Sequence, residues 1–397
     1  MLDLSRVLAG PHCTRMLADL GADVIKVEPP DGDLTRFASP RVNGLSTYFV
    51  QQNSGKRNMS IDLRTPRGVE LVIELAGHCD VLVENYRAGV MQRLGLGADE
   101  MTARFPRLVY ASISGYGATG PWVDRRAYAP VVAAEAGITK MQGDARGGQY
   151  ANDPLSHADT YTALELTTAI LAALYQRERT GTGQAIDVSM AETMLFVNDH
   201  LNGELWDGPE DADAIRNFGP GDYIVFETGD GDRVIVSGHP AERGTFTYFL
   251  RSFGVEHLAD DPRFADVAER KANIDALHDL LLEAARTIPD AATFEDRCSA
   301  NNLAVGRLRS ARDLADSEWA AARGAIAEVS DRGGGTIRIP NPPWRFSGAE
   351  VGVRGDPRYR GEDNRAVLAE LLGYDDGTID GLEAAGVLSS RVPSSPA

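Results

Sequence analysis

The stretch TPRGVELVIELAGHCDVLVEN, residues 65–85, decides the fold because it is typical of a helix followed at once by a buried strand. Thr65 is a preferred N-cap residue, and Pro66 suits the first helical position. Apolar residues at helical spacing, Val69, Val72 and Leu75, then predict one buried face. The run DVLVEN that follows has the length and the β-branched content of a buried strand.

The same alternation continues on both sides of this stretch. Upstream, CTRMLADLG (13–21) predicts a helix and ADVIKVE (22–28) a strand, and downstream ADEMTARFP (98–106) and RLVYASISGYG (107–117) predict another pair. Strands that alternate with helices form a mostly parallel sheet with helices on both faces. We therefore expect an α/β fold with a Rossmann-like layer. No G-x-G-x-x-G motif follows the first strand, which disfavours a nicotinamide or flavin dinucleotide.

The pattern changes at about residue 201, which predicts a second domain. GDYIVFETGDGDRVIVSG (221–238) is typical of a β-hairpin that turns at Gly229, Asp230 and Gly231, and helical segments follow over about 240–326. The stretch TIRIPNPPWRFSG and the final helical segments return to strand and then helix. We expect a large domain over 1–200, a smaller α+β domain over 201–330 and a C-terminal segment over 331–397.

Charge and cysteine content exclude several classes of protein. Forty Lys and Arg against 58 Asp and Glu give a net charge of −18, which argues against nucleic acids or anionic membranes as partners. Cys13, Cys79 and Cys298 lack disulfide-framework and metal-ligand spacing, so no metal site is expected. Glu165 interrupts the longest apolar run, and the N-terminus lacks a signal-peptide pattern. We expect a cytoplasmic protein.

One acid, Asp159, precedes a nearly uninterrupted apolar segment. The segment predicts a helix from Thr160 to about Arg179 that ends at Gly181, and its apolar residues on all sides predict burial. Asp159 has two interpretations from the sequence alone. It is a structural N-cap, or it is a reactive carboxylate at a buried, positive helix end.

Basic residues follow several predicted strands, where ligands of open α/β sheets bind: Lys26, Arg36, Lys56, Arg57, Arg87 and Arg93. Arginine and lysine there would suit phosphate groups. Spacing alone favours the simpler interpretation that these residues are solvated surface charges. The sequence contains no GxxxxGK[ST], GxSxG or HExxH motif, and its seven histidines are scattered.

Five segments, in this order, resemble the signatures of the class III coenzyme A transferases. This family includes formyl-CoA transferase, carnitine CoA-transferase and α-methylacyl-CoA racemase. The segments are AGPHCTRMLADLGADVIKVEPPDGDLTR (9–36), NSGKRNMSIDL (53–63), DVLVENYRAGVMQRLGLG (80–97), RLVYASISGYGATGP (107–121) and AILAALYQRERTGTGQAIDVSM (169–190). The resemblance implies a Rossmann-like large domain built from both chain ends, a small domain between them, and an interlocked homodimer.

The resemblance also implies a site and its chemistry. Asp159 matches the family's nucleophile, which forms an acyl-aspartyl anhydride and then an aspartyl-CoA thioester. CoA and acyl-CoA are implied as substrates beside a carboxylic acid, with no tightly bound cofactor. The positions implied in CoA binding are Val7, Leu8, Ala9, Arg36, Lys56, Asn85, Tyr86, Arg93, Arg126 and Tyr128.

Two alternatives to CoA transfer stay open at the level of sequence. The racemase branch of the family uses a histidine together with the aspartate, and here the matching position is Tyr128, a poor base at neutral pH. Glu242 falls near a supporting glutamate of the racemases, and the stretch 238–244 lacks the glycine-rich loop of formyl-CoA transferase. We expect an acyl-CoA:carboxylate CoA-transferase. The alternatives are a racemase and a non-catalytic CoA-binding scaffold.

Overall fold

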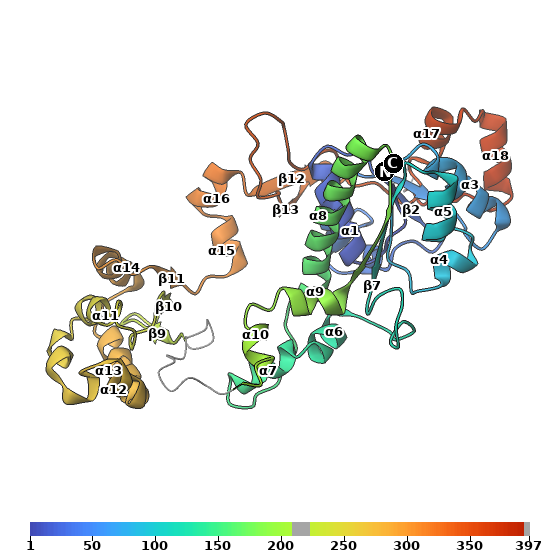
Figure 1. Ribbon diagram of the computed structural model, residues 1–397. Coiled ribbons are helices and arrows are strands. Elements are labelled where there is room, and N and C mark those ends of the chain that lie inside the picture. Colours follow the sequence, from blue (N-terminus) through green and yellow to red (C-terminus); the bar gives the residue numbers. More distant parts are fainter. Residues whose placement is uncertain (209–222, 393–397) are drawn as a thin grey trace. The chain divides into compact units, whose positions relative to one another are not determined.

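Six parallel strands form the central sheet of the protein, here described over residues 1–208 and 223–392 of a computed structural model (Figure 1). Every neighbouring pair in this sheet is parallel, which confirms the α/β layer expected from the sequence. The strands follow the order β5 (Arg57–Ser60), β2 (Ile25–Glu28), β1 (Leu2–Asp3), β6 (Val81–Glu84), β7 (Val109–Ser114) and β8 (Ala185–Ser189).

Two compact units make up the described chain. Within the described residues, the larger consists of 1–143, 149–206 and 320–392, and the smaller of 144–148, 207–208 and 223–319. The larger unit therefore contains both the first and the last described segment of the chain, and it holds the whole parallel sheet.

Helices cover both faces of the sheet. Successive residues of a strand point to opposite faces, so apolar side chains on each face pack against a different set of helices. In β6, Leu82 packs in the cluster that includes Leu71 and Leu75 of α3, while Val81 and Val83 pack with Leu166 and Ile170 of α8. The helices of this unit include α1 (Ala9–Asp19), α2 (Thr47–Asn53), α3 (Pro66–Ala76), α4 (Val90–Arg93), α5 (Ala98–Arg104), α6 (Ala129–Glu135), α7 (Ile138–Asp144), α8 (His157–Thr180), α9 (Met190–Phe196) and α10 (Leu201–Glu204).

The C-terminal segment protects the edge strand β5. The backbone N–H of Asn58 donates to Asp363 at 2.8 Å, and that of Ser60 donates to Asn364 at 2.9 Å. These side chains bond backbone groups that an uncovered edge would expose. The segment also forms a hairpin and several helical turns, namely β12 (Ile326–Ser330), β13 (Thr336–Pro340), α17 (Asn364–Val367), η5 (Leu368–Leu372) and α18 (Asp376–Ala384).

The smaller unit has its own three-stranded antiparallel sheet and its own core. Strands β9 (Val225–Glu227) and β10 (Arg233–Val236) form the hairpin expected there, and β11 (Val305–Arg307) pairs with β10. Residues 221–222 of the expected hairpin stretch lie outside the described residues. Four of the phenylalanines in this core pack ring against ring: Phe226, Phe249, Phe253 and Phe294. The helices around them are α11 (Phe246–Phe253), α12 (Val267–Ala272), α13 (Ile274–Arg286) and α14 (Ala291–Ala300).

Helix α8 differs from the sequence-based expectation in two ways. It begins at His157 rather than Thr160, so Asp159 lies in its first turn, and the N-cap residue is Ser156. Its outer side is also not buried within the described chain. Leu164, Leu171 and Tyr175 are exposed at 46%, 45% and 65%. An apolar composition thus did not imply that every face packs inside one chain.

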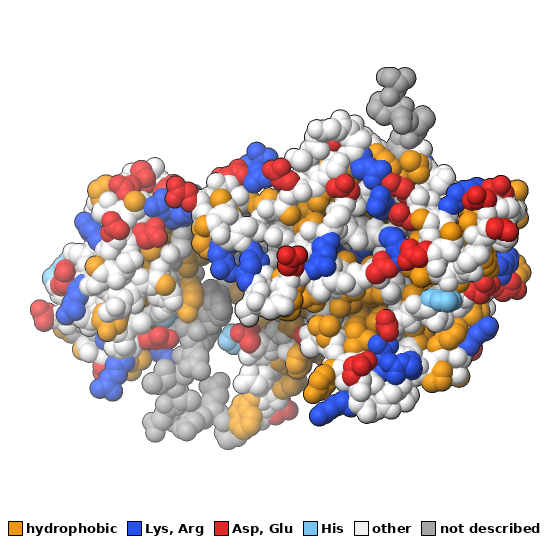
Figure 2. Space-filling view, turned by 90° about the horizontal axis from the view of Figure 1, so that it is seen from above, with side chains coloured by type: hydrophobic (Ala, Val, Ile, Leu, Met, Phe, Trp, Pro, Cys, Tyr) orange, Lys and Arg blue, Asp and Glu red, His pale blue; other side chains and the backbone are white. Residues whose placement is uncertain are grey.

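Charged side chains of both signs are interspersed over the face seen in Figure 2. The acidic excess of the sequence is therefore not gathered into a single acidic region on that face. Any region that attracts anions must come from a local arrangement of basic side chains.

Candidate active site

Asp159 faces the start of helix α1. The backbone N–H of Ala9, the first residue of α1, acts on its carboxylate as a hydrogen-bond donor that lowers the pKa of Asp159. The N–H groups of a first helical turn have no partner within the helix and carry partial positive charge. Ala9 therefore stabilises negative charge at this position, whether on the carboxylate or on an oxyanion that forms beside it.

Burial changes the acidity of Asp159. Loss of contact with water raises the pKa of Asp159 to about 6, and the hydrogen bond from Ala9 offsets only part of this effect. The carboxyl group is therefore ionised at pH 7 but poorly solvated. A poorly solvated carboxylate retains more of its intrinsic reactivity as a nucleophile.

A pocket of about 510 Å³ opens in front of Asp159 within the larger unit. Its volume lies in the range common for small-molecule sites. Three loops that follow the carboxyl ends of β1, β6 and β7 supply most of the wall, as expected for an open α/β sheet. Their lining residues are Arg6, Val7 and Ala9, then Asn85, Tyr86, Arg87 and Ala88, and then Gly115, Val123, Arg125, Arg126, Ala127 and Tyr128.

The charges on this wall are unbalanced. Four arginines line the pocket, Arg6, Arg87, Arg125 and Arg126, whereas Asp159 is the single acid among its described lining residues. Arg125 pairs with Glu135, and its guanidinium lies 4.4 Å from the ring centroid of Trp122. The pocket thus combines one carboxylate with a wall that favours an anionic ligand.

Six of the residues expected to bind CoA lie on this wall: Val7, Ala9, Asn85, Tyr86, Arg126 and Tyr128. Leu8 belongs to the same loop as Val7 and Ala9, but its side chain is buried and does not line the pocket. Arg93 lies on α4 and is not a lining residue either. The contact of each residue with CoA stays a prediction.

Arg36 does not occupy the expected position on the wall. Its guanidinium forms an ion pair with Glu28 at 2.7 Å and stacks over the ring of Phe49, 3.7 Å from the centroid. Leu34, two residues earlier, lines the pocket instead. Arg36 therefore contributes to packing around β2 in this structure, and its expected contact with CoA stays a prediction.

Lys56, another expected CoA contact, has an enclosed ammonium group. Only 2% of the residue is exposed, and its Nζ has acceptors at 2.7–3.1 Å from Asp3, Pro11, Thr14 and Asn53. An ammonium group has only three N–H donors. All of them are therefore used inside the protein, and none is left for a phosphate.

Arg6, Leu34 and Arg125 line the pocket without having been expected there, whereas Arg87 is among the basic residues that the sequence places after strands. Arg6 and Arg87 each lie within three residues after a strand of the sheet. The strand-end rule that selects Arg87 therefore also applies to Arg6. No comparable signal marks Arg125, because its position depends on Glu135 and Trp122.

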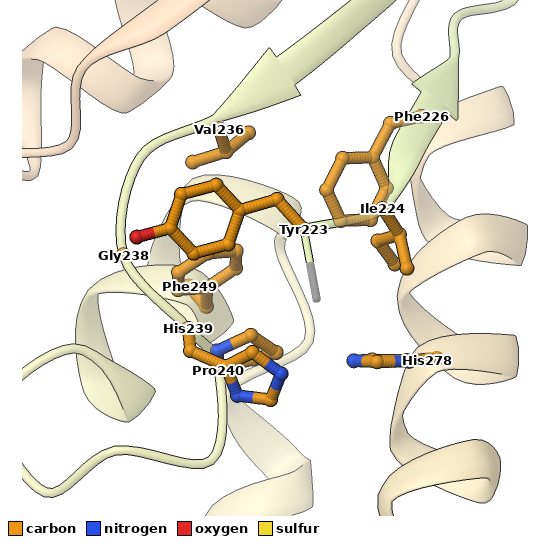
Figure 3. Close-up of a pocket in the computed structure, with 9 residues that line it drawn as sticks. All are labelled: Tyr223, Ile224, Phe226, Val236, Gly238, His239, Pro240, Phe249 and His278. Atoms are coloured by element: carbon orange, nitrogen blue, oxygen red, sulfur yellow. The ribbon is translucent and has the colours of Figure 1, made fainter. Parts of the chain in front are cut away.

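A second cavity lies in the smaller unit, between β9, β10 and helices α11 and α13 (Figure 3). Tyr223, His239 and His278 are among the side chains around it, and its volume is about 10 Å³. This volume is about that needed for one water molecule. An acyl-CoA does not fit there. Glu242 also belongs to this unit, where its backbone N–H donates to the carbonyl of His239.

His157, two residues before Asp159, has its own partners. Its Nδ1 lies against the Asp153 carboxylate, and its ring stacks on Tyr161 with centroids 5.2 Å apart. It is not among the pocket-lining residues. Within the described ranges 1–208 and 223–392, we find no group of three or more His, Cys, Asp or Glu side chains arranged to hold a metal ion. No helix in the same ranges is long and apolar enough to cross a membrane.

Comparison with known proteins places the chain in a family. The sequence profile described as CoA-transferase family III matches residues 1–364. The chain belongs to CoA-transferase family III. Its relatives include succinyl-CoA:glutarate CoA-transferase of Mus musculus, 33% identical over 98% of this chain and 89% of the relative. Acetyl-CoA:oxalate CoA-transferase of Acetobacter aceti is 36% identical over 91% of this chain and 90% of that protein.

A solved structure supports the assignment of this chain to CoA-transferase family III. A CAIB/BAIF family protein from Brucella suis superimposes with a TM-score of 0.80 at 32% identity, over 93% of this chain and 97% of that one. The sequence resemblance to the class III family is thereby confirmed. The protein is an enzyme that transfers CoA between an acyl-CoA and a carboxylate.

Proposed function

We propose that this family III CoA-transferase works through covalent catalysis by Asp159. The observation that carries the proposal is that Asp159 is the single acid among the described residues lining an arginine-rich pocket. Its carboxylate is half-buried and faces one backbone N–H donor, that of Ala9. A nucleophile beside a fixed donor is the arrangement that acyl transfer needs.

Four steps then account for the transfer. The Asp159 carboxylate attacks the thioester carbonyl and expels CoA thiolate, which leaves an acyl-aspartyl anhydride. The thiolate attacks the aspartyl carbonyl, so the first carboxylic acid departs and an aspartyl-CoA thioester remains. The acceptor carboxylate attacks this thioester to form a new anhydride and release thiolate. The thiolate finally attacks the new acyl carbonyl, which gives the product acyl-CoA and free Asp159.

The arginines would hold the substrates during these steps. Arg6, Arg87 and Arg126 offer planar donors that pair well with phosphate or carboxylate groups. A neighbouring pocket of about 280 Å³ shares Arg6 and Tyr86 with the first one, and its wall includes the apolar residues Val27, Ile61, Leu63 and Leu94. We propose that CoA extends along this shared wall and presents its thioester to Asp159.

Short dicarboxylic acids are the first acceptors to test. Relatives of this chain are named for transfer to glutarate and oxalate. An arginine-lined wall is compatible with such a second carboxylate. A panel should therefore include oxalate, succinate and glutarate beside a monocarboxylic acid.

Covalent labelling tests the mechanism directly. We expect that incubation with a reactive acyl-CoA followed by hydroxylamine converts Asp159 to a hydroxamate, because anhydrides and thioesters of an aspartate are both cleaved by this amine. Peptide mass spectrometry locates the label. Asp153→Ala is the matched control, since this acid lies outside the pocket and should leave labelling at position 159 intact. Labelling at another residue, or none during active turnover, would contradict the proposal.

The rate should depend on pH through Asp159. The attacking group is the carboxylate, and its pKa is raised to about 6. We therefore expect kcat/KM to fall below pH 6, by about tenfold for each further pH unit. A rate profile from pH 4.5 to 8 with a stable acyl-CoA measures this limb. An acid limb near pH 4 would mean that the attacking carboxylate is not that of Asp159.

The racemase alternative requires a second acid or base on the opposite side of the substrate carbon. No histidine is among the residues that line the Asp159 pocket in the described chain. Transfer without exchange of the α-proton for deuterium separates the two reactions. A scaffold, by comparison, would bind CoA and show neither reaction.

We also propose that the enzyme acts as an interlocked homodimer, as the family resemblance implies. The exposed apolar side chains Leu164, Leu171 and Tyr175 of α8 support an interface with a second copy. Light scattering of the purified protein distinguishes a dimer from a monomer.

A further inference from the structure

The loop between β1 and α1 carries a strained residue directly beside the active site. Val7 has a φ of 68°, in the left-handed region that β-branched residues strongly avoid. Such a conformation persists only where its surroundings over-determine it, and it is frequent at functional sites. Val7 lines the pocket two residues before Ala9, whose N–H faces Asp159.

Two side chains from other strand ends hold this loop. The side-chain amide of Asn85 makes two hydrogen bonds with the backbone of Arg6. Its Oδ1 accepts the Arg6 N–H at 2.7 Å, and its Nδ2 donates to the Arg6 carbonyl at 2.8 Å. Asp33 accepts the N–H of Val7 at 3.2 Å. Consecutive peptide groups are thus fixed from two sides of the loop.

Lys26 contacts both the loop and Asp33. Its Nζ donates to the carbonyl of Ser5 at 2.9 Å and forms an ion pair with Asp33 at 3.2 Å. Both side chains are almost fully buried, at 1% and 0% exposure. The Asp33 carboxylate, which accepts the Val7 N–H, is therefore itself held in place. It can in turn fix the position of the loop.

We propose that Asp33 and Asn85 are positioning residues for catalysis, which hold the backbone of Arg6 and the strained Val7 so that the Ala9 N–H is directed at Asp159. The proposal rests on the nucleophilic role of Asp159. Asn85 thereby has a function beyond its expected contact with CoA. The proposal also explains why the loop keeps the strained conformation at Val7. Neither residue reacts; both act through the backbone of the loop.

The test uses Asp33→Asn and Asn85→Ala in the full-length enzyme. We expect each to lower kcat by roughly 10- to 100-fold, because displacement of a donor by about 1 Å weakens transition-state stabilisation by this order. The hydrogen bond from Ala9 lowers the pKa of Asp159. Its weakening must therefore move the acid limb of the rate profile to higher pH, a change that a purely structural role would not produce.

Thr35→Val is the matched control. It removes the hydrogen bond that the Thr35 hydroxyl donates to Asp33 at 2.9 Å but leaves the contact from Asp33 to Val7. We expect kcat within about threefold of the parent and an unmoved acid limb. Asn85→Ala keeps the buried pair of Lys26 and Asp33, so the proposal stays testable where Asp33→Asn does not fold.

The outcomes separate this proposal from the proposed mechanism. Parental kcat and pH profile in both folded variants would overturn the positioning roles, while loss of activity in Asp159→Ala would still support the nucleophile. A lower kcat with an unmoved acid limb would also overturn them, since it indicates general loosening. Retained transfer by Asp159→Ala would instead remove the mechanism on which the proposal rests.

Discussion

Replacing Asp159 by alanine should abolish CoA transfer and leave the fold intact. Without the carboxylate no anhydride forms, and we expect kcat to fall by roughly 10⁴-fold or more, as for other lost nucleophiles. Alanine is preferable to asparagine here, because an asparagine can deamidate back to aspartate. A coupled assay of acyl-CoA formation, with acceptor acid at saturation, measures the loss.

The stability of Asp159→Ala provides an internal control, because removal of this acid should not lower the stability of the protein and should raise it at high pH. The pKa of Asp159 is higher in the folded state, at about 6, than the ordinary value of 3.8. The folded state therefore binds this proton more tightly, and its stability decreases as the pH rises from about 4 to 6. Removal of the acid relieves a penalty whose upper limit is on the order of 3 kcal/mol at pH 8.

Asp159→Ala should consequently show a melting temperature no lower than that of the parent at pH 8, and a smaller advantage at pH 5. Inactivity with retained or increased stability identifies a group kept for chemistry rather than for folding. Inactivity together with a much lower melting temperature would leave the nucleophile unproven, and activity close to the parent would exclude it.

Local signals were sufficient for the scaffold that positions this acid. Thr65 caps α3, with its hydroxyl accepting the Gly68 N–H at 3.0 Å, and Pro66 is the first helical residue, as the sequence predicts. Apolar periodicity predicts β6 and α3 equally well. These features depend on neighbours a few residues away, which a single sequence displays directly.

The errors concern contacts between distant residues. The sequence leaves open whether Asp159 caps its own helix, whereas in the structure the N-cap is Ser156 and the N–H that acts on the Asp159 carboxylate is that of Ala9, 150 positions earlier in the chain. The sequence also cannot show that one side of α8 stays exposed in a single chain, because apolar composition predicts burial without naming the covering partner. The strain at Val7 has no sequence signal either, since valine ordinarily avoids that conformation.

The surroundings of Lys56 likewise depend on residues far away in the sequence. Its place after a turn suggested a surface charge near a strand end, where a phosphate would bind. In the structure, Asp3, Pro11 and Thr14 converge on its ammonium from 42 to 53 positions away. These contacts favour a role of Lys56 in stability, whereas its contact with CoA stays a prediction, and the two roles can be separated by measurement.

Lys56→Met should destabilise the protein strongly. The substitution leaves Asp3 buried at 0% exposure and without its nearest cation, and removal of one partner from a buried pair costs about 3–5 kcal/mol. Burial by itself raises the pKa of Asp3, yet the ammonium groups of Lys56 and Lys26 lower it to about 2. The parent thus gains stability from ionised Asp3 above pH 4, and this gain is lost as the pH falls toward 2.

In Lys56→Met the pKa of Asp3 rises, so the loss should be largest at pH 7 and smaller near pH 4. Urea unfolding at both pH values measures the difference. The double variant Asp3→Asn with Lys56→Met should lose less stability than the two single changes added together, because it leaves no unpaired charge.

Arg126→Met is the contrasting control, since this exposed residue lines the pocket: it should raise KM for acyl-CoA and leave unfolding unchanged. The reverse pattern, with stable Lys56→Met protein and a raised KM, would restore Lys56 as a CoA contact and show that its buried hydrogen bonds open in the working enzyme.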